Sequence, residues 1–249
     1  GAGGNFPTLD SAFNKLNIDG ITGAITLNLT DTLYVATPHA MTATQQLLQR
    51  ARENQKQSIV QPEHGIANAD FSPAMPSGIT NGFVLEGPIS GASATNRITI
   101  RPATGKAVRI TGNVFNTVFL NNASYVTIDG IGLTGATRLT IECPSTDVGN
   151  SAIGLIGDCD NTIIQNITAR GLFNASNVIE FDAINENATP DSNIIRNNSV
   201  PSGRYGILFV GTATALAKGN RITGNLIGAA ADSIGEFGIY CQGTAGMSV

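Results

Sequence analysis

The sequence predicts an all-β solenoid of stacked coils, with a helix at its N-terminal end and one partly helical insertion. The main observation is a phrase that occurs twice: Asp160–Thr168 returns as Asp191–Ser199, 31 residues later. Weaker copies are Ser124–Gly132 and Gly219–Asn225. Aligning the central isoleucines gives spacings of 36, 31 and 27 residues between Ile128, Ile164, Ile195 and Ile222. Self-similarity at a period of about 20–50 residues is typical of a solenoid.

Composition is the second observation. The 249-residue chain holds 29 glycines and no Trp, and 13% of its residues are charged. Gly and Asn tolerate the tight turns that join many short strands. Hydrophobic residues make up 41% of the chain, which is enough for a continuous core. The length fits one large all-β domain.

Charge and hydropathy exclude two classes of partner. The net charge is −4, and no run of Lys or Arg is present, which argues against nucleic-acid binding. No stretch approaches about twenty consecutive apolar residues, so we expect no transmembrane segment. Residues Gly1–Pro7 lack the charged and apolar regions of a signal peptide, which leaves either a chain without one or a mature chain.

Residues 1–35 are predicted to cap the solenoid. Apolar residues recur at helical spacing over Leu9–Leu16, with Thr8 as the N-cap and Gly20 just beyond the helix. A strand over Ile21–Leu29 follows, because apolar and polar residues alternate there. A solenoid needs such an atypical end unit to cover its core.

Residues 36–80 form the predicted insertion. Thr42–Lys56 is rich in good helix formers and poor in apolar residues, which predicts an exposed helix. Loop follows, since three prolines and little periodicity are present. His39 and His64 both lie here, and surface residues are the favoured interpretation over metal ligands.

Residues 81–249 are predicted to form the coils, because short strands follow one another without a helical stripe. The expected strands are 82–85, 98–102, 108–111, 117–120, 126–133, 139–143, 153–156, 162–168, 178–184, 192–200, 205–210, 221–227 and 237–241.

A second class of strand recurs in step with the isoleucine column. Its members are Phe119, Leu155, Phe181, Leu208 and Tyr240. Two classes repeating together indicate coils of several strands, stacked so that equivalent strands pair in parallel about 4.8 Å apart. Asn166 and Asn197 share one position with Gly130 and Gly224, where stacked Asn side chains and Gly suit a common turn.

These patterns resemble the right-handed parallel β-helix family, pectate-lyase-like in its repeats, as found in large secreted or surface proteins of bacteria. The resemblance covers residues 1–35 and 81–249. It is carried by residues 5–13, 98–102, 124–130, 161–166 and 204–207. It implies a mature chain and an extracellular or cell-surface location. It specifies the fold more than an activity, because such helices host enzymes, adhesins and structural shafts.

The activities that such a resemblance suggests are those of enzymes that act on polysaccharides. Glycoside hydrolysis needs two carboxyl groups across the scissile bond, and the weak candidates are Asp158, Asp160, Glu180 and Asp182. The polygalacturonase-like pattern also expects a Gly-His-Gly, whereas no His follows His64. A lyase needs a basic residue, and Lys106, Lys218 and the arginines form no cluster in the sequence.

The same four acids are weak candidates for a calcium site, because carboxylates in turns suit a hard cation. A solvated face is the favoured interpretation, so we expect no cofactor, with calcium as the alternative. The three cysteines, Cys143, Cys159 and Cys241, are expected to be small buried hydrophobes, with a disulfide between Cys143 and Cys159 as a secondary possibility.

The expected function is therefore a non-catalytic, structural or adhesin-like module. The chain ends at Gly246–Val249 without an evident cap, so further coils or other copies of the chain are the expected partners, end to end in a filament. The alternative is a polysaccharide lyase, a glycoside hydrolase or a carbohydrate-binding module that uses the lateral groove. Core or turn packing is the favoured interpretation over sugar stacking for most of the tyrosines Tyr125, Tyr205 and Tyr240.

Overall fold

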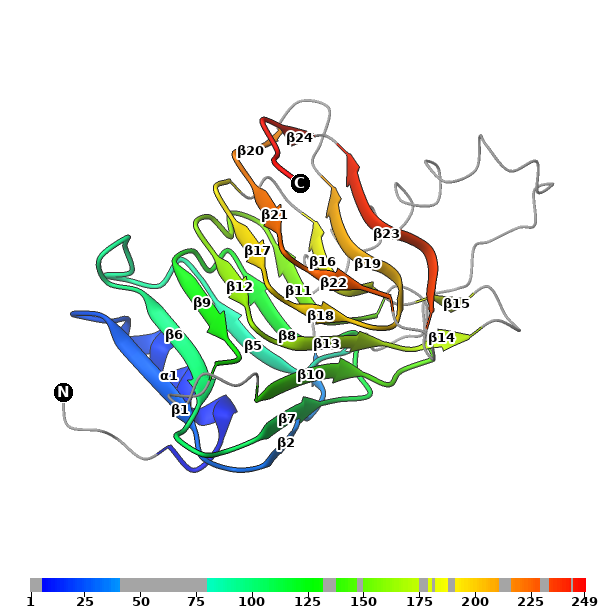
Figure 1. Cartoon of the computed structure of the whole chain (residues 1–249). Coiled ribbons are helices and arrows are strands. Elements are labelled where there is room, and N and C mark those ends of the chain that lie inside the picture. Colours follow the sequence, from blue (N-terminus) through cyan, green and yellow to red (C-terminus); the bar gives the residue numbers. More distant parts are fainter. Residues whose placement is uncertain are drawn as a thin grey trace.

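The computed structural model describes residues 6–40, 80–131, 138–146, 150–174, 179–180, 182–187, 191–210, 216–228, 233–242 and 244–249. The described chain is mostly β, which confirms the predicted class. Three six-stranded parallel sheets dominate it (Figure 1).

The chain contributes strands to the three sheets in turn. Sheet 1 holds β1 (Ile25–Leu29), β6 (Ile98–Pro102), β9 (Val126–Asp129), β12 (Ile163–Gln165), β17 (Ile194–Arg196) and β21 (Arg221–Thr223). Sheet 2 holds β2 (Leu33–Val35), β7 (Val108–Thr111), β10 (Leu139–Cys143), β13 (Thr168–Gly171), β18 (Ser199–Val200) and β22 (Leu226–Ile227). Sheet 3 holds β5 (Phe83–Glu86), β8 (Asn116–Asn121), β11 (Ser151–Ile156), β16 (Asp182–Asn187), β19 (Gly203–Val210) and β23 (Ile234–Gln242).

Three two-stranded sheets complete the described strands. They are antiparallel β3 (His39–Ala40) with β4 (Thr80–Asn81), antiparallel β14 (Phe173–Asn174) with β15 (Ile179–Glu180), and parallel β20 (Ala217–Lys218) with β24 (Thr244–Ala245).

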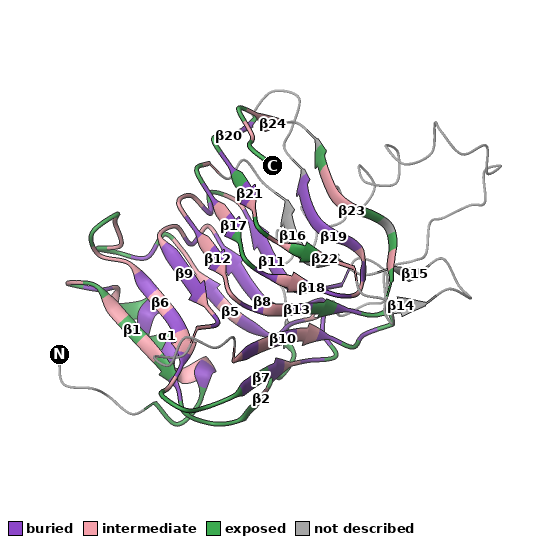
Figure 2. Ribbon diagram, viewed as in Figure 1, coloured by how far each residue is buried: buried purple, intermediate pink, exposed green. Residues whose placement is uncertain are grey.

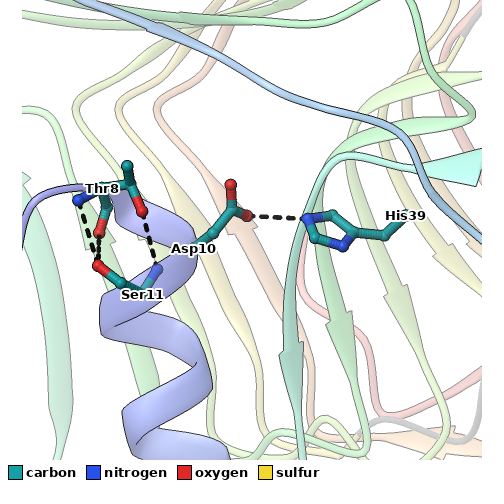
Figure 3. A network of polar contacts seen from close by, with 4 residues as sticks. All are labelled: Thr8, Asp10, Ser11 and His39. Atoms are coloured by element: carbon teal, nitrogen blue, oxygen red, sulfur yellow. Dashed lines mark hydrogen bonds and ion pairs between the residues drawn. The ribbon is translucent and has the colours of Figure 1, made fainter.

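The N-terminal helix is confirmed. Helix α1 spans Leu9–Asp19, and the Thr8 and Ser11 side chains each accept from the other's backbone N–H, which forms a capping box. The helix buries its apolar face and packs on β5. Asp10 in the first turn lies 3.1 Å from Nε2 of His39 at the start of β3 (Figure 3). This contact joins the helix to a strand at the start of the predicted insertion.

The predicted helix over Thr42–Lys56 and His64 lie outside the described residues. Strand β1 begins at Ile25, later than the predicted Ile21. Among the described helices, none is long and apolar enough to cross a membrane.

The isoleucine column is confirmed. Ile128 pairs with Ile164, Ile164 with Ile195, and Ile195 with Ile222, each at most 2% exposed. Register extends the column through Ile100 to Leu27. All six belong to, or pack on, one apolar cluster shared by the sheets. Burying a side chain of this size contributes about 1.5–3 kcal/mol, so the column stabilises each repeat on its neighbours.

The prediction of long strands that continue through the turn between sheets 1 and 2 is wrong. The expected strand 162–168 divides into β12 and the start of β13, and 192–200 divides into β17 and β18. The physical reason is the left-handed backbone of Asn166 and Asn197, with φ of 56° and 55°, which turns the chain within two residues. Gly224 takes the equivalent place with φ of 64°.

Gly130 does not follow that rule, because its φ is not among the positive ones. A Cβ on Gly130 would lie 1.9 Å from the carbonyl oxygen of Asn166 in the next repeat. Close approach of two backbones, and not a left-handed turn, requires glycine at this position.

The predicted second column is partly wrong. Phe119, Leu208 and Tyr240 do share one register position of sheet 3, but Val84, Gly154 and Asn185 occupy it in the other strands. Leu155 pairs instead with Leu120, one residue along. A shift of one residue moves a side chain to the opposite face of a sheet. Leu208 and Tyr240 accordingly form a separate cluster with Tyr205. Phe181 lies outside the described residues.

The three cysteines are free. Cys143 and Cys159 are buried, as predicted, and they form no disulfide. Cys241 is exposed, contrary to the prediction, because it lies on β23 at the edge of sheet 3. Its local environment still raises the pKa of its thiol to about 11 through desolvation.

Candidate functional site

The candidate acids Asp158 and Asp160 lie in the turn that leads from β11 of sheet 3 to β12 of sheet 1. Two left-handed residues shape this turn, Gly157 with φ of 75° and Asn161 with φ of 53°. Oδ1 of Asn122, in the preceding repeat, accepts the N–H of Asp158 at 3.0 Å. A Cβ on Gly157 would lie 1.8 Å from that same oxygen, so glycine is needed for the bond to form.

Asp160 is one member of a ladder of side-chain-to-backbone hydrogen bonds. The N–H of Asp160 donates to Oγ of Ser124 at 3.0 Å, and that hydroxyl donates to the carbonyl of Asp158 at 2.7 Å. Oδ1 of Asp160 accepts the N–H of Asp191 at 2.8 Å. Oδ1 of Asp191 accepts the N–H of Lys218 at 2.7 Å. The steps are 36, 31 and 27 residues, identical to those of the isoleucine column.

The electrostatics of Asp160 follow from this position. Desolvation raises the pKa of its carboxyl above the usual value, and the negative charges of Asp191 and Asp158 raise it further. The hydrogen bond from the Asp191 backbone opposes that shift. A carboxyl with a raised pKa can serve as a general acid. Here, however, one of its oxygens is already committed to the backbone of the next repeat.

Glu180 and Asp182 were predicted to point outward from one strand. The structure places them in different elements, Glu180 in β15 opposite Phe173 and Asp182 in β16 opposite Ser151. Their side chains lie outside what the structure describes. Within the described residues, no three His, Cys, Asp or Glu side chains lie close enough together to share a metal ion. A calcium site that includes Glu180 and Asp182 stays a prediction.

A second ladder, of asparagines, lies at the turns on both sides of sheet 1, and its members are not the predicted Asn166 and Asn197. Before the strands, Oδ1 of Asn193 accepts the N–H of Thr162 at 2.6 Å, and Oδ1 of Asn220 accepts the N–H of Asn193 at 2.8 Å. After them, Oδ1 of Asn198 accepts the N–H of Ile167 at 3.1 Å, and Asn225 does the same for Asn198 at 3.0 Å.

A third polar column runs along the outward side of sheet 1. Nε2 of Gln165 donates to Asp129 at 2.8 Å, and Nε of Arg196 donates to Oε1 of Gln165 at 2.7 Å. Nε of Arg101 donates to Asn28 at 3.2 Å. Each of these residues directly follows a member of the isoleucine column in the sequence. That offset is the signal that could have revealed the column.

The tyrosines divide between turn and sheet. Tyr125 occupies a turn with φ of 60°. Tyr205, which is 2% exposed, stacks on Phe237 with the ring centroids 5.9 Å apart, and the Tyr240 ring lies 5.7 Å from that of Tyr205. Packing against aromatic neighbours therefore accounts for Tyr205 and Tyr240, as predicted.

Comparison with protein-family models, with curated proteins and with solved structures gives no match. The class of protein is thus defined by the described fold, a mostly β chain of parallel sheets with a capped helix at its N-terminal end. The candidate site adds carboxylates and amides that join one repeat to the next.

Proposed function

We propose that the chain is a right-handed parallel β-helix that serves as a non-catalytic, rigid structural or adhesin-like module of a secreted or surface-displayed bacterial protein. The observation that carries the proposal is the ladder through Ser124, Asp160, Asp191 and Lys218. Of the catalytic candidates, Asp160 accepts a hydrogen bond from the backbone of the next repeat, and Asp191, at the same position one repeat later, does the same. Groups held in this way stabilise stacking, which is the role of a shaft.

The apolar column supports the same proposal. Strands of successive repeats pair in parallel in all three sheets, and the same cluster of buried side chains runs through them. In such an architecture each repeat contacts only its neighbours, and stability is close to a sum over the interfaces between repeats. The product is a stiff rod whose length scales with the number of repeats.

Partners of this module are proposed at the edge of sheet 3 formed by β23. Among the described strands, β23 pairs on one side with β19 only, and Phe237 on it is 43% exposed. An edge strand with an exposed aromatic residue can pair with another strand. We propose that further coils or another copy of the chain add there, end to end. Sedimentation over a range of concentrations tests the self-association, and a monomer at every concentration would contradict it.

A pair of deletions tests the solenoid. Removing residues 165–195 joins Ile164 to Arg196 and keeps the inward and outward alternation of the strand. Removing residues 165–194 joins Ile164 to Ile195 and shifts every following side chain to the wrong face. We expect the first variant to unfold cooperatively with a mostly β circular dichroism spectrum, and the second to fail to fold. Equal outcomes for the two variants would contradict the stacked arrangement.

Incubation with uronate-containing and neutral polysaccharides tests the absence of catalysis. We expect neither unsaturated products nor new reducing ends. Appearance of either product, and its loss in the Asp160→Asn variant, would overturn the structural proposal in favour of a lyase or hydrolase. No cofactor is needed for the proposed role, so chelator should leave the melting temperature unchanged.

A further inference from the structure

The two edges of sheet 3 differ in what covers them. The strand order runs from β23 through β19, β16, β11 and β8 to β5, so β23 and β5 are the edge strands of this sheet. Helix α1 contacts β5, and Figure 1 shows β23 at the opposite end of the stack. An edge strand presents N–H and C=O groups that can pair with another chain. The cover on each edge therefore decides where a further strand can be added.

The β5 edge is closed by the N-terminal helix. Leu9, Phe13 and Leu16 of α1 belong to the apolar cluster that runs through the sheets. Oδ1 of Asn17 accepts the N–H of Glu86, the last residue of β5, at 3.0 Å. A side chain of the helix thus occupies a backbone donor that a further strand would need. Covering an edge with a helix is one of the ways in which proteins prevent the addition of strands.

The last strand of sheet 1 is covered by the chain itself. Ser248 forms a parallel bridge with Arg221 of β21. The N–H of Ile222 donates to the carbonyl of Ser248 at 2.8 Å, and the N–H of Ser248 donates to the carbonyl of Asn220 at 3.0 Å. Within the described ranges, no strand does the same for the outer side of β23.

The second half of β23 is suited to pairing with an identical strand. A register shift with β19 lies before Phe237, and the register is regular from Phe237 to Gln242. This segment, Phe-Gly-Ile-Tyr-Cys-Gln, contains neither a charged residue nor a proline. Phe237 is 43% exposed and Cys241 is exposed, and exposed stretches lie along β23 (Figure 2). Charges and prolines are what usually keep edge strands apart, and short uncharged segments with high β-propensity pair readily with copies of themselves.

We propose that the partner at this edge is a second copy of the chain, and that the two β23 strands pair antiparallel about a twofold axis. This dimer specifies the partner at the end-to-end contact proposed above, and it rests on that proposed function. A head-to-tail filament would instead place β23 of one copy against β5 of the next, where α1 lies. A twofold contact uses the same open edge of both copies and closes on itself, so assembly stops at two copies.

Sedimentation velocity of the 249-residue chain over a range of concentrations tests the pairing. We expect the mass to rise from one copy to two and to stop there. Phe237→Lys, which adds a charge at the open edge, should weaken association at least about tenfold, because a twofold contact contains the change twice. Ile18→Lys is the matched control, since Ile18 is 82% exposed on α1 at the closed end and the substitution is of the same kind. It should associate as the wild type does.

Amide hydrogen exchange gives a second readout that needs no substitution, so the test stands even where Phe237→Lys does not fold. The amides of Phe237–Gln242 should exchange more slowly as the protein concentration rises, whereas those of Leu9–Asp19 should not change. Assembly beyond two copies that is weakened by Ile18→Lys would overturn the twofold contact and leave the end-to-end contact of the proposed function in place. A monomer at every concentration, with unchanged exchange in β23, would contradict both.

Discussion

The isoleucine column of sheet 1 and the asparagine turn that follows it lie a few residues apart, yet they hold the repeats together in different ways. Ile195 contributes volume in a shared apolar cluster, and another aliphatic side chain of similar size could replace it. Asn198 contributes directional hydrogen bonds instead. Its side-chain amide accepts the N–H of Ile167 and donates to the carbonyl of Ile164 at 3.0 Å. Stacking is therefore driven by the column, and its register is specified by the turn.

The largest expected effect comes from emptying the column. Ile195→Ala should lower the free energy of unfolding by about 4 kcal/mol, because Ile195 is 1% exposed and the loss leaves a cavity between two paired strands. Ile195→Val should cost only about 1 kcal/mol. Denaturant unfolding measures both. Similar losses in the two variants would mean that volume does not decide stability at this position.

The second-largest loss of stability is expected from removing the buried side-chain amide of the turn. Asn198→Ala should cost about 3 kcal/mol, since Asn198 is 2% exposed and its removal leaves the N–H of Ile167 and the carbonyl of Ile164 without these partners. Asn198→Asp keeps an acceptor and loses the donor, so it should rescue only part of the loss. A cost below that of Ile195→Val would contradict the role given to the turn.

Sequence reasoning found the column because one residue type recurs there. Ile128, Ile164, Ile195 and Ile222 are identical, and their offsets could be aligned by eye. The turn was less visible, because Asn166 and Asn197 share a left-handed backbone with Gly224, which has no side chain to align with theirs. The predicted strands therefore ran through it.

The candidate site was harder to predict, since only two of its members, Asp160 and Asp191, are of the same residue type. Ser124, Asp160, Asp191 and Lys218 are linked by hydrogen bonds to the backbone, which place little demand on residue type. In sheet 3, Leu155 was placed one residue out of register, because apolar neighbours on both faces of β11 hide the alternation.

A smaller effect is expected from the left-handed position itself. Gly224→Ala should cost about 1–2 kcal/mol, because its φ is 64° and a Cβ would lie 2.5 Å from Oδ1 of Asn197. Asn197→Gly, at the same position one repeat earlier, should change stability by less than about 0.5 kcal/mol, since glycine adopts this backbone without strain. The melting temperatures of the two variants distinguish the effect of backbone conformation on stability from that of the side chain. An equal loss of stability in both would contradict the conformational explanation.

The smallest effect tests the ladder through Asp160, and it depends on pH. Because the folded pKa of Asp160 is raised, the protonated carboxyl favours the folded chain. That contribution is complete below the unfolded pKa, near pH 4, and is lost as the pH rises through the higher folded pKa. Asp160→Asn keeps an oxygen for the N–H of Asp191 and cannot ionise. Its melting temperature should therefore rise relative to the wild type between about pH 3 and pH 7. Asp31→Asn, at an exposed turn, controls for the loss of one negative charge. The same pH trend in both variants would show that net charge, and not the position of Asp160 between repeats, governs the difference.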